Sequence, residues 1–425
     1  MARKRPHPAG GTIVDMPTVD SLVTPPDLVT SDDVRAARDV LAGVVRRTPL
    51  EECEPLRAVV GGPTYLKCEN LQHAGSFKLR GAYLRLARLS PEERATGVVA
   101  ASAGNHAQGV ALAARRVGTH ATVFMPIGAS LPKVAATREY GATVELVGDS
   151  IDQAMAAATQ FAAERGAVYV HPFDHPDVVA GQGTVGLEIL EQCPDARTIV
   201  VPTGGGGLVA GIGTVIAAER PEVRLVAVQA SGAAAVPPSL TAGRPVALAE
   251  MRTMADGIAV GQPGALTLAH ISAQVDEVRT VTEEHLSQAL LFALERAKVV
   301  VEPAGAAALA AVLADPEAFA PPVVVVLSGG NIDPLLLLRV IEHGMGAAGR
   351  YLDMTVRFAD RPGMLAGLLG VLARQRANVL DIAHVRHDAA LRVGDVEVSL
   401  TVETDGPDHS HRTVNALRAA GYSVE

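Results

Sequence analysis

Short apolar runs alternate with Ala-rich stretches along most of this chain, and that alternation limits the folds open to it. Residues 323–327 read Val-Val-Val-Val-Leu, and residues 199–201 and 225–229 are nearly as apolar. A strand that is apolar at every position is buried on both faces, as in parallel sheets. Ala-dense stretches such as residues 152–165 predict the connecting helices. The repeated strand–helix–strand order therefore predicts an α/β fold of parallel sheets with right-handed crossovers.

The same pattern predicts further strands, and a helix near the start of the chain. The expected strands are residues 64–67, 97–100, 121–125, 143–147 and 168–171. Ser31-Asp32-Asp33 predicts an N-cap with first-turn acids ahead of a helix over residues 34–44. Residues 1–27 are rich in Pro, Thr and Asp, so we expect a flexible tail there and no secretory signal.

The chain is long enough for more than one domain, at 425 residues. The Gly/Ala-rich residues 344–349 are typical of a linker. We expect one α/β domain over residues 28–346. Residues 350–425 have a different order, which predicts a ferredoxin-like βαββαβ module. The strands expected in this module are residues 351–358, 378–387 and 393–403 and a last one at Tyr422, and the helices are residues 363–375 and 410–420.

Composition excludes several classes of protein. The net charge is −9, which is unfavourable for a general nucleic-acid binder. No run of 18 or more apolar residues occurs, so we expect no membrane span and a cytoplasmic protein. Cys53, Cys68 and Cys193 form no CxxC pair, which fits a reducing compartment with cysteines that pack as small apolar residues.

The first segment that could carry chemistry is Gly-Ser-Phe-Lys-Leu-Arg-Gly-Ala, with Lys78 among small residues and beside an aromatic ring. A lysine at the start of a helix faces the positive end of the helix dipole, which lowers its pKa. A neutral amine is what Schiff-base chemistry requires. The alternative is an ordinary surface lysine.

The second segment, residues 102–109, reads Ser-Ala-Gly-Asn-His-Ala-Gln-Gly after an apolar strand. Backbone N–H groups at a helix start, together with Ser and Asn side chains, favour an anion such as a carboxylate. A plain helix cap with a Gly turn is the alternative, and His106 by itself is more typical of a structural residue.

The third segment is Gly-Gly-Gly-Gly-Leu at residues 204–208, directly after a buried strand. Such a loop lets the backbone wrap a phosphate. It also matches a loose dinucleotide fingerprint, which would require an acid after the next strand. That strand ends at Gln229, so we favour a monophosphate over a dinucleotide or an empty Gly turn.

Of two further segments, one is expected to contact a ligand and the other is not expected to bind a metal. The buried strand 323–327 ends in Ser328 and two glycines, at the sheet edge where ligands gather in α/β folds, although a plain strand-to-loop turn is equally possible. Residues 171–175, His-Pro-Phe-Asp-His, look like metal ligands. Because Pro172 implies an extended loop and no further Cys/His cluster follows, we expect no metal there.

Together these segments resemble the fold-type-II pyridoxal-phosphate enzymes, and most closely threonine ammonia-lyases with one C-terminal ACT-like regulatory domain. The resemblance runs from about residue 28 to the C-terminus. Residues 255–260 and 302–306 support it, and Asp-Arg-Pro-Gly-Met-Leu at residues 360–365 resembles the first strand-to-helix turn of ACT domains.

The resemblance implies a role for each matching residue. Lys78 would form the Schiff base with pyridoxal 5'-phosphate, and Phe77 would lie against the ring. Ser102 and the backbone of residues 103–106 would hold the substrate carboxylate, and Glu302 would lie near the ring and the substrate side chain. The other implied cofactor contacts are the phosphate with the backbone of Gly204, Gly205, Gly206, Gly207 and Leu208, the ring hydroxyl with Asn105, and the ring nitrogen with Ser328.

The implied reaction is loss of water and then ammonia from L-threonine, giving 2-oxobutanoate, with serine giving pyruvate. Displaced Lys78 would remove the Cα proton. The neutral partner at the ring nitrogen, Ser328, suits prompt loss of the β-hydroxyl over transamination. The reaction could open isoleucine biosynthesis, with an amino-acid effector. That effector would bind a homodimer or homotetramer at the ACT-like residues Asp360, Arg361, Pro362, Gly363, Met364 and Leu365.

Departures and rival classes bear on this interpretation. Serine racemases of the fold carry a hydroxyl where Ala103 stands, which favours a lyase, although a serine racemase or serine dehydratase remains the nearest alternative. Residues 229–235 lack the acids that bind a divalent cation in some relatives, so we expect no required metal there.

Two other classes of protein are less consistent with the sequence. Gln229 argues against an NAD-dependent oxidoreductase, because it stands where the acid of a dinucleotide site would be. An RNA-binding βαββαβ module needs surface aromatics, and residues 350–425 offer few.

Overall fold

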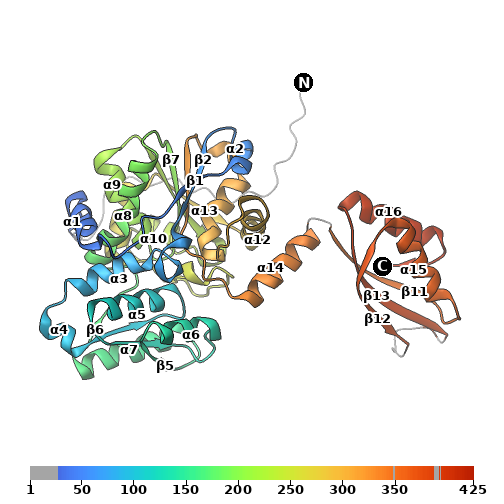
Figure 1. Ribbon diagram of the computed structural model, residues 1–425, viewed down its shortest axis with the longest axis horizontal. Coiled ribbons are helices and arrows are strands. Elements are labelled where there is room, and N and C mark those ends of the chain that lie inside the picture. Colours follow the sequence, from blue (N-terminus) through green and yellow to red (C-terminus); the bar gives the residue numbers. More distant parts are fainter. Residues whose placement is uncertain (1–26, 348–349, 387–391, 393) are drawn as a thin grey trace. The chain divides into compact units, whose positions relative to one another are not determined.

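The computed structural model describes residues 27–347, 350–386, 392 and 394–425 (Figure 1). The predicted tail lies outside these residues, apart from residue 27. The chain forms two compact units, Met1–Asp333 and Pro334–Glu425. The division falls at the start of a helix, Pro334–Ala347, that includes residues 344–347 of the expected linker. Across the described residues, no helix is long and apolar enough to cross a membrane.

The first unit contains a six-stranded sheet in the order β1-β2-β10-β7-β8-β9. Its five strands from β2 to β9 run parallel, and β1 pairs antiparallel with β2 at the edge. Continuous apolar sequence explains why β7, β8 and β10 are central strands. The strands are β1 (Leu50–Glu52), β2 (Thr64–Cys68), β7 (Thr198–Pro202), β8 (Arg224–Ala230), β9 (Glu277–Val281) and β10 (Val323–Leu327).

A second, smaller sheet of the same unit has four parallel strands in the order β5-β4-β3-β6. Each sheet has its own apolar core: Ile199, Ile212 and Val324 belong to that of the large sheet, and Val110 and Val123 to that of the small one. The small-sheet strands are β3 (Val98–Ala101), β4 (Ala121–Met125), β5 (Thr143–Leu146) and β6 (Val168–Tyr169).

Helices connect the parallel strands, as the Ala-rich stretches predict (Figure 1). They are α1 (Ser31–Leu41), α2 (Glu54–Val60), α3 (Lys78–Ala87), α4 (Pro91–Thr96), α5 (Asn105–Val117), α6 (Leu131–Glu139), α7 (Ile151–Arg165), α8 (Pro176–Gln192), α9 (Gly207–Glu219), α10 (Val236–Ala242), α11 (Ala265–Gln274), α12 (Glu283–Phe292) and α13 (Pro303–Ala314). Parallel strands with helical crossovers confirm the predicted α/β class.

Three details differ from the sequence prediction. Helix α1 begins at Ser31 because Thr30, not Ser31, is its N-cap, in a capping box with Asp33. Strand β1 is short and polar, and gave no apolar signal. Strand β9 was not predicted, because Glu277 and Arg279 interrupt its apolar residues. In the folded protein these charges are neutralised by ion pairs, since Glu277 contacts both Arg224 and Arg279.

The three cysteines are free and buried, as expected for residues that pack in the core.

The second unit begins with α14 (Pro334–Ala347) and continues as strand, helix, strand, strand, helix, strand. Its antiparallel sheet has the order β12-β13-β11-β14, which confirms the predicted ferredoxin-like module. Every second residue of β13 is buried, as expected for a sheet with helices on one face. The elements are β11 (Tyr351–Ala359), α15 (Met364–Gln375), β12 (Asn378–Val385), β13 (Asp395–Glu403), α16 (Pro407–Ala419) and β14 (Ser423–Val424).

Candidate active site

The candidate site lies where the carboxyl ends of parallel strands meet. Asn105 begins α5 just beyond β3, Gly204 follows β7 and Ser328 follows β10. Lys78 is the first residue of α3, as predicted, and its segment is fixed to the end of β10: the Phe77 N–H donates to the Ser328 carbonyl at 3.2 Å. Four segments scattered along the sequence thus meet between the carboxyl ends of the large sheet and the small sheet.

The Lys78 amine is held in a low-dielectric position. Its Nζ donates to the backbone carbonyl of Pro172 at 2.9 Å and lies 5.1 Å from the centre of the Phe77 ring. Burial lowers the pKa of Lys78 to about 8, although nearby Glu302 acts in the opposite direction. The direction agrees with the sequence prediction, but the main cause is burial rather than the helix dipole.

The four glycines form a tight turn into α9. Gly206 is the N-cap with φ +95°, a left-handed conformation that glycine adopts at low cost. The first intrahelical bond of α9 runs from the Ala210 N–H to the Gly206 carbonyl. The N–H groups from Gly206 to Val209 therefore have no intrahelical partner and point out of the helix end. Such a set of donors suits a phosphate.

Three distant segments hold this glycine loop from outside. The Phe173 ring lies so close that a Cβ on Gly205 would be 2.4 Å from it. Thr267 donates from its hydroxyl to the Gly205 carbonyl at 2.6 Å, while its own N–H donates to Asp174 at 3.0 Å. Gln229, which stands where a dinucleotide-binding acid would be, donates to the Gly204 carbonyl at 3.4 Å. The loop is therefore shaped by packing as well as by its glycines.

Asn105 and Glu302 form the polar floor of the site. The Asn105 amide nitrogen donates to Oε1 of Glu302, which is only 1% exposed. Burial, with a smaller effect from Asp256, raises the pKa of Glu302 to about 7. Lys133, which is paired with Asp256 at 2.5 Å, opposes that rise. A carboxyl that titrates near neutral pH thus lies beside Asn105.

The segment assigned to the substrate carboxylate precedes α5. The Ser102 hydroxyl accepts a hydrogen bond from the Gly104 N–H at 3.1 Å. The N–H groups of the first α5 residues have no intrahelical partner, so they remain donors for an anion. His106 is buried, its Nε2 lies 2.9 Å from the Val170 carbonyl, and burial lowers its pKa to about 3. It stays neutral, as the structural interpretation of His106 requires.

Residues 171–175, where we expect no metal, contribute to the candidate site in another way, because two of them contact it. Pro172 provides the carbonyl that holds Lys78, and Phe173 lies under the glycine loop. His171 stabilises this bend because its Nδ1 accepts hydrogen bonds from the N–H groups of Phe173 and Asp174. A His, a Pro and an Asp close together in the sequence are typical of such a bend, and they could have indicated it before the structure did. Within the described residues, no group of three His, Cys, Asp or Glu side chains could hold a metal.

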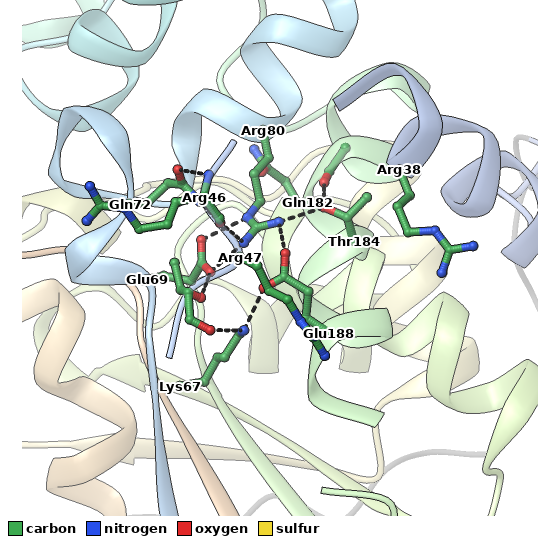
Figure 2. Close-up of polar contacts among 12 residues, drawn as sticks. Arg38, Arg46, Arg47, Lys67, Glu69, Gln72, Arg80, Gln182, Thr184 and Glu188 are labelled. Carbon is green, nitrogen blue, oxygen red and sulfur yellow. Dashed lines mark hydrogen bonds and ion pairs between the residues drawn. The ribbon is translucent and has the colours of Figure 1, made fainter. Parts of the chain in front are cut away.

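Helix α3 is anchored by a buried charge network two residues after Lys78 (Figure 2). The Arg80 guanidinium donates to both oxygens of Glu69, at 2.8 and 2.9 Å, and to Glu188 at 2.7 Å. Lys67 reaches the other oxygen of Glu188 at 2.6 Å. Arg80, Lys67 and Glu69 are fully buried, so two cations and two anions balance each other inside the protein. This network was not predicted, because its members are far apart in the chain and only the fold brings them together.

In the second unit, residues 360–363 are exposed and lead into α15. Gly363 is its N-cap with φ +89°, and the Met364 carbonyl accepts from the Tyr422 hydroxyl at 2.9 Å. Arg386 lies 3.6 Å from Asp360. The six residues assigned to an effector are therefore an exposed turn, residues 360–363, and the first two residues of α15, which are partly buried.

Comparison with known proteins identifies the class. Residues 41–329 match the family model described as pyridoxal-phosphate dependent enzyme, and the chain belongs to that family. Its relatives include L-threonine ammonia-lyases of Thermotoga maritima, 46% identical over 93% of this chain and 99% of the relative, and of Geobacter sulfurreducens, 46% identical over 92% and 98%.

Solved structures of similar proteins agree. Threonine deaminase isoform 2 of Solanum lycopersicum, in its processed form, has a TM-score of 0.72 at 36% identity, covering 79% of this chain and 93% of that chain. Maize serine racemase has a TM-score of 0.71 at 35% identity, covering 76% and 99%. The chain is a pyridoxal-phosphate dependent lyase-type enzyme of fold type II.

Proposed function

We propose that this enzyme deaminates L-threonine to 2-oxobutanoate and ammonia, and L-serine to pyruvate, with pyridoxal 5'-phosphate as cofactor. Two ammonia-lyase relatives at 46% identity, each covered over nearly its whole length, support the reaction. The observation that carries the proposal is the Lys78 amine, whose pKa burial lowers to about 8. It donates to the carbonyl of Pro172, and the next residue, Phe173, packs against the glycine loop 204–207.

The residues present fit the cofactor. Free N–H groups at the start of α9 suit its phosphate, and the Phe77 ring offers an apolar surface beside Lys78. Asn105 would donate to the ring hydroxyl and Ser328 would face the ring nitrogen. When bound, the cofactor supplies an electron sink for the electron pair left at the substrate Cα.

The chain's own groups would then handle binding and protons. Ser102 and the N–H groups at the start of α5 hold the substrate carboxylate. Lys78, with a pKa near 8, can be a neutral base toward the Cα proton at working pH. Glu302, with a pKa near 7, can hold or release a proton close to the ring and the substrate side chain.

A direct assay tests the proposal. The purified enzyme should be yellow and should release 2-oxo acid from L-threonine, and more slowly or equally from L-serine. A colourless protein that cannot be loaded with the cofactor, or a yellow one that releases no 2-oxo acid, would contradict it.

Serine racemase is the second candidate, because solved racemases from maize and Dictyostelium discoideum are similar to this chain at 35% and 33% identity. The presence of Ala103 disfavours it, since a methyl group cannot supply a proton. The two activities are separated by measuring D-serine and pyruvate in the same reaction.

We further propose that the second unit binds an amino-acid effector at the turn 360–365, and that the enzyme is a cytoplasmic homodimer or homotetramer. The N–H groups in the first turn of α15 that have no intrahelical partner would donate to a carboxylate. Calorimetry of the full chain with isoleucine and valine, with matched rate measurements, tests the effector. Absence of both binding and any rate change would leave the unit a structural one.

A further inference from the structure

Asn331 lies in the loop after β10 and joins three segments of the site. Its amide nitrogen donates to the Ala74 carbonyl at 2.8 Å and to Oδ1 of Asn105 at 2.7 Å. Oε1 of Gln108, one turn further along α5, lies 3.3 Å from the same nitrogen. Asn331 therefore links the turn before Lys78 to the start of α5.

The orientation of both amides follows from one backbone group. A carbonyl such as that of Ala74 can only accept, so the Asn331 side chain must present its NH₂ to it. The same NH₂ faces Asn105, which must then present its oxygen. The NH₂ of Asn105 is left facing away from Asn331, toward Glu302, to which it donates. A chain of donors thus runs in one direction, from Asn331 through Asn105 to Glu302.

The Asn331 side chain packs closely against the turn at Gly75. A Cβ on Gly75 would lie 2.2 Å from Oδ1 of Asn331, and Gly75 itself has φ +70°. The neighbouring Gly330 N–H donates to the Gly75 carbonyl at 2.9 Å. The turn and the loop therefore fit each other closely, and the Asn331 amide has little freedom to rotate away.

We propose that Asn331 is a positioning residue that fixes the Asn105 amide with its nitrogen toward Glu302 and the cofactor ring hydroxyl. This inference rests on the proposed function, because it needs the cofactor ring beside Asn105. Asn331 does not touch the reacting atoms; it acts through Asn105.

Asn331→Asp is the sharpest test, because it keeps the shape and removes the donor. The carboxylate can only accept, so Asn105 should turn its NH₂ toward residue 331 and present its oxygen to the ring and to Glu302. Asn70→Asp is the matched control. Asn70 likewise donates to a backbone carbonyl, that of Val300 at 3.0 Å, and among the described residues no hydrogen bond joins it to Asn105.

The readout is the visible absorption spectrum of the holoenzyme across pH, together with kcat/KM. We expect Asn331→Asp to change the ratio of the cofactor bands and their pH midpoint, and to lower kcat/KM by about tenfold, the size expected for one lost hydrogen bond. Asn331→Ala, which adds no charge, should act in the same direction if the Asp variant fails to fold. In an Asn105→Ala background, either substitution should no longer alter the spectrum.

These measurements distinguish failure of the positioning role from failure of the proposed function. If Asn105→Ala changes the spectrum and Asn331→Asp behaves as Asn70→Asp does, the positioning role is wrong and the proposed function stands. Additive effects of Asn331 and Asn105 substitutions would also overturn it. If Asn105→Ala leaves the spectrum unchanged, the placement of Asn105 at the ring fails, and the inference fails with it.

Discussion

Asn105 and Glu302 are 197 residues apart in the chain and share a buried hydrogen bond, from the amide nitrogen of one to Oε1 of the other. The contact joins the first residue of α5 to the N-cap of α13, so the small-sheet and large-sheet halves of the first unit meet at the site. Because Glu302 is almost fully buried there, its proton affinity differs from that of an exposed carboxyl.

Glu302 should make the stability of the cofactor-free protein depend on pH. Its folded pKa, near 7, lies above the ordinary 4.5, so the folded state holds the proton over that interval and the unfolded state does not. The free energy of unfolding should fall as pH rises from 4.5 to 7, by an amount of about 3 kcal/mol attributable to this group. Urea titrations of wild type and Glu302→Gln check it, since the variant should lack this part of the dependence. Parallel pH profiles for the two proteins would count against the buried carboxyl.

Lys78→Ala should abolish 2-oxo acid release while the protein stays folded. Loss of the base alone removes about 10²–10⁴ in rate, and loss of the covalent link to the cofactor adds to this. Lys298→Ala, at an exposed lysine, is the control and should remain active. Comparable ammonia release by the wild type and the Lys78 variant would rule out Lys78 as the reactive amine.

Gly205→Ala should weaken cofactor binding. The new methyl group would overlap the Phe173 ring, at 2.4 Å, and push the loop out of shape. We expect about a tenfold or larger rise in the dissociation constant for pyridoxal phosphate, since overpacking typically costs about 1–3 kcal/mol. Equilibrium titration of the cofactor-free protein measures it. Phe173→Ala should restore part of the affinity in the double variant, and a lack of any rescue would mean that the ring is not the cause.

Arg80→Ala should destabilise the protein by about 3–5 kcal/mol, because it leaves two buried carboxylates, Glu69 and Glu188, with Lys67 as the remaining cation of the network. Arg57→Ala is the matched control: its ion pair with Glu52 is exposed, and its loss should cost no more than about 1 kcal/mol. Urea unfolding of both variants gives the comparison. An Arg80 variant as stable as the Arg57 variant would mean that the network contributes little.

Ala103→Ser should raise D-serine formation from a very low level, because a hydroxyl beside Ser102 offers a proton to the second face of the substrate. The measurement is chiral chromatography of serine after incubation, with pyruvate release as the check that the variant is active. An active variant that forms no more D-serine than the wild type would contradict the idea that residue 103 lies at the second face of the substrate.

The sequence by itself determined the α/β class, the ferredoxin-like module and the motifs at the strand ends. These depend on neighbours in the chain: four consecutive valines in β10, glycines at the start of α9 and a helix starting at Lys78 are local signals. Even local signals did not determine the exact start of α1: several adjacent residues could cap this helix, and in the structure the N-cap is Thr30.

The tertiary structure decided what surrounds those motifs. The pKa values of Lys78 and Glu302 depend on burial, and burial depends on segments far away in sequence. Phe173 lies under the glycine loop, and Asn331 orients Asn105, only because the fold brings the strand ends of two sheets together. Periodicity and turn chemistry are properties of adjacent residues, whereas solvation and hydrogen-bond partners are set by the packing of the whole chain.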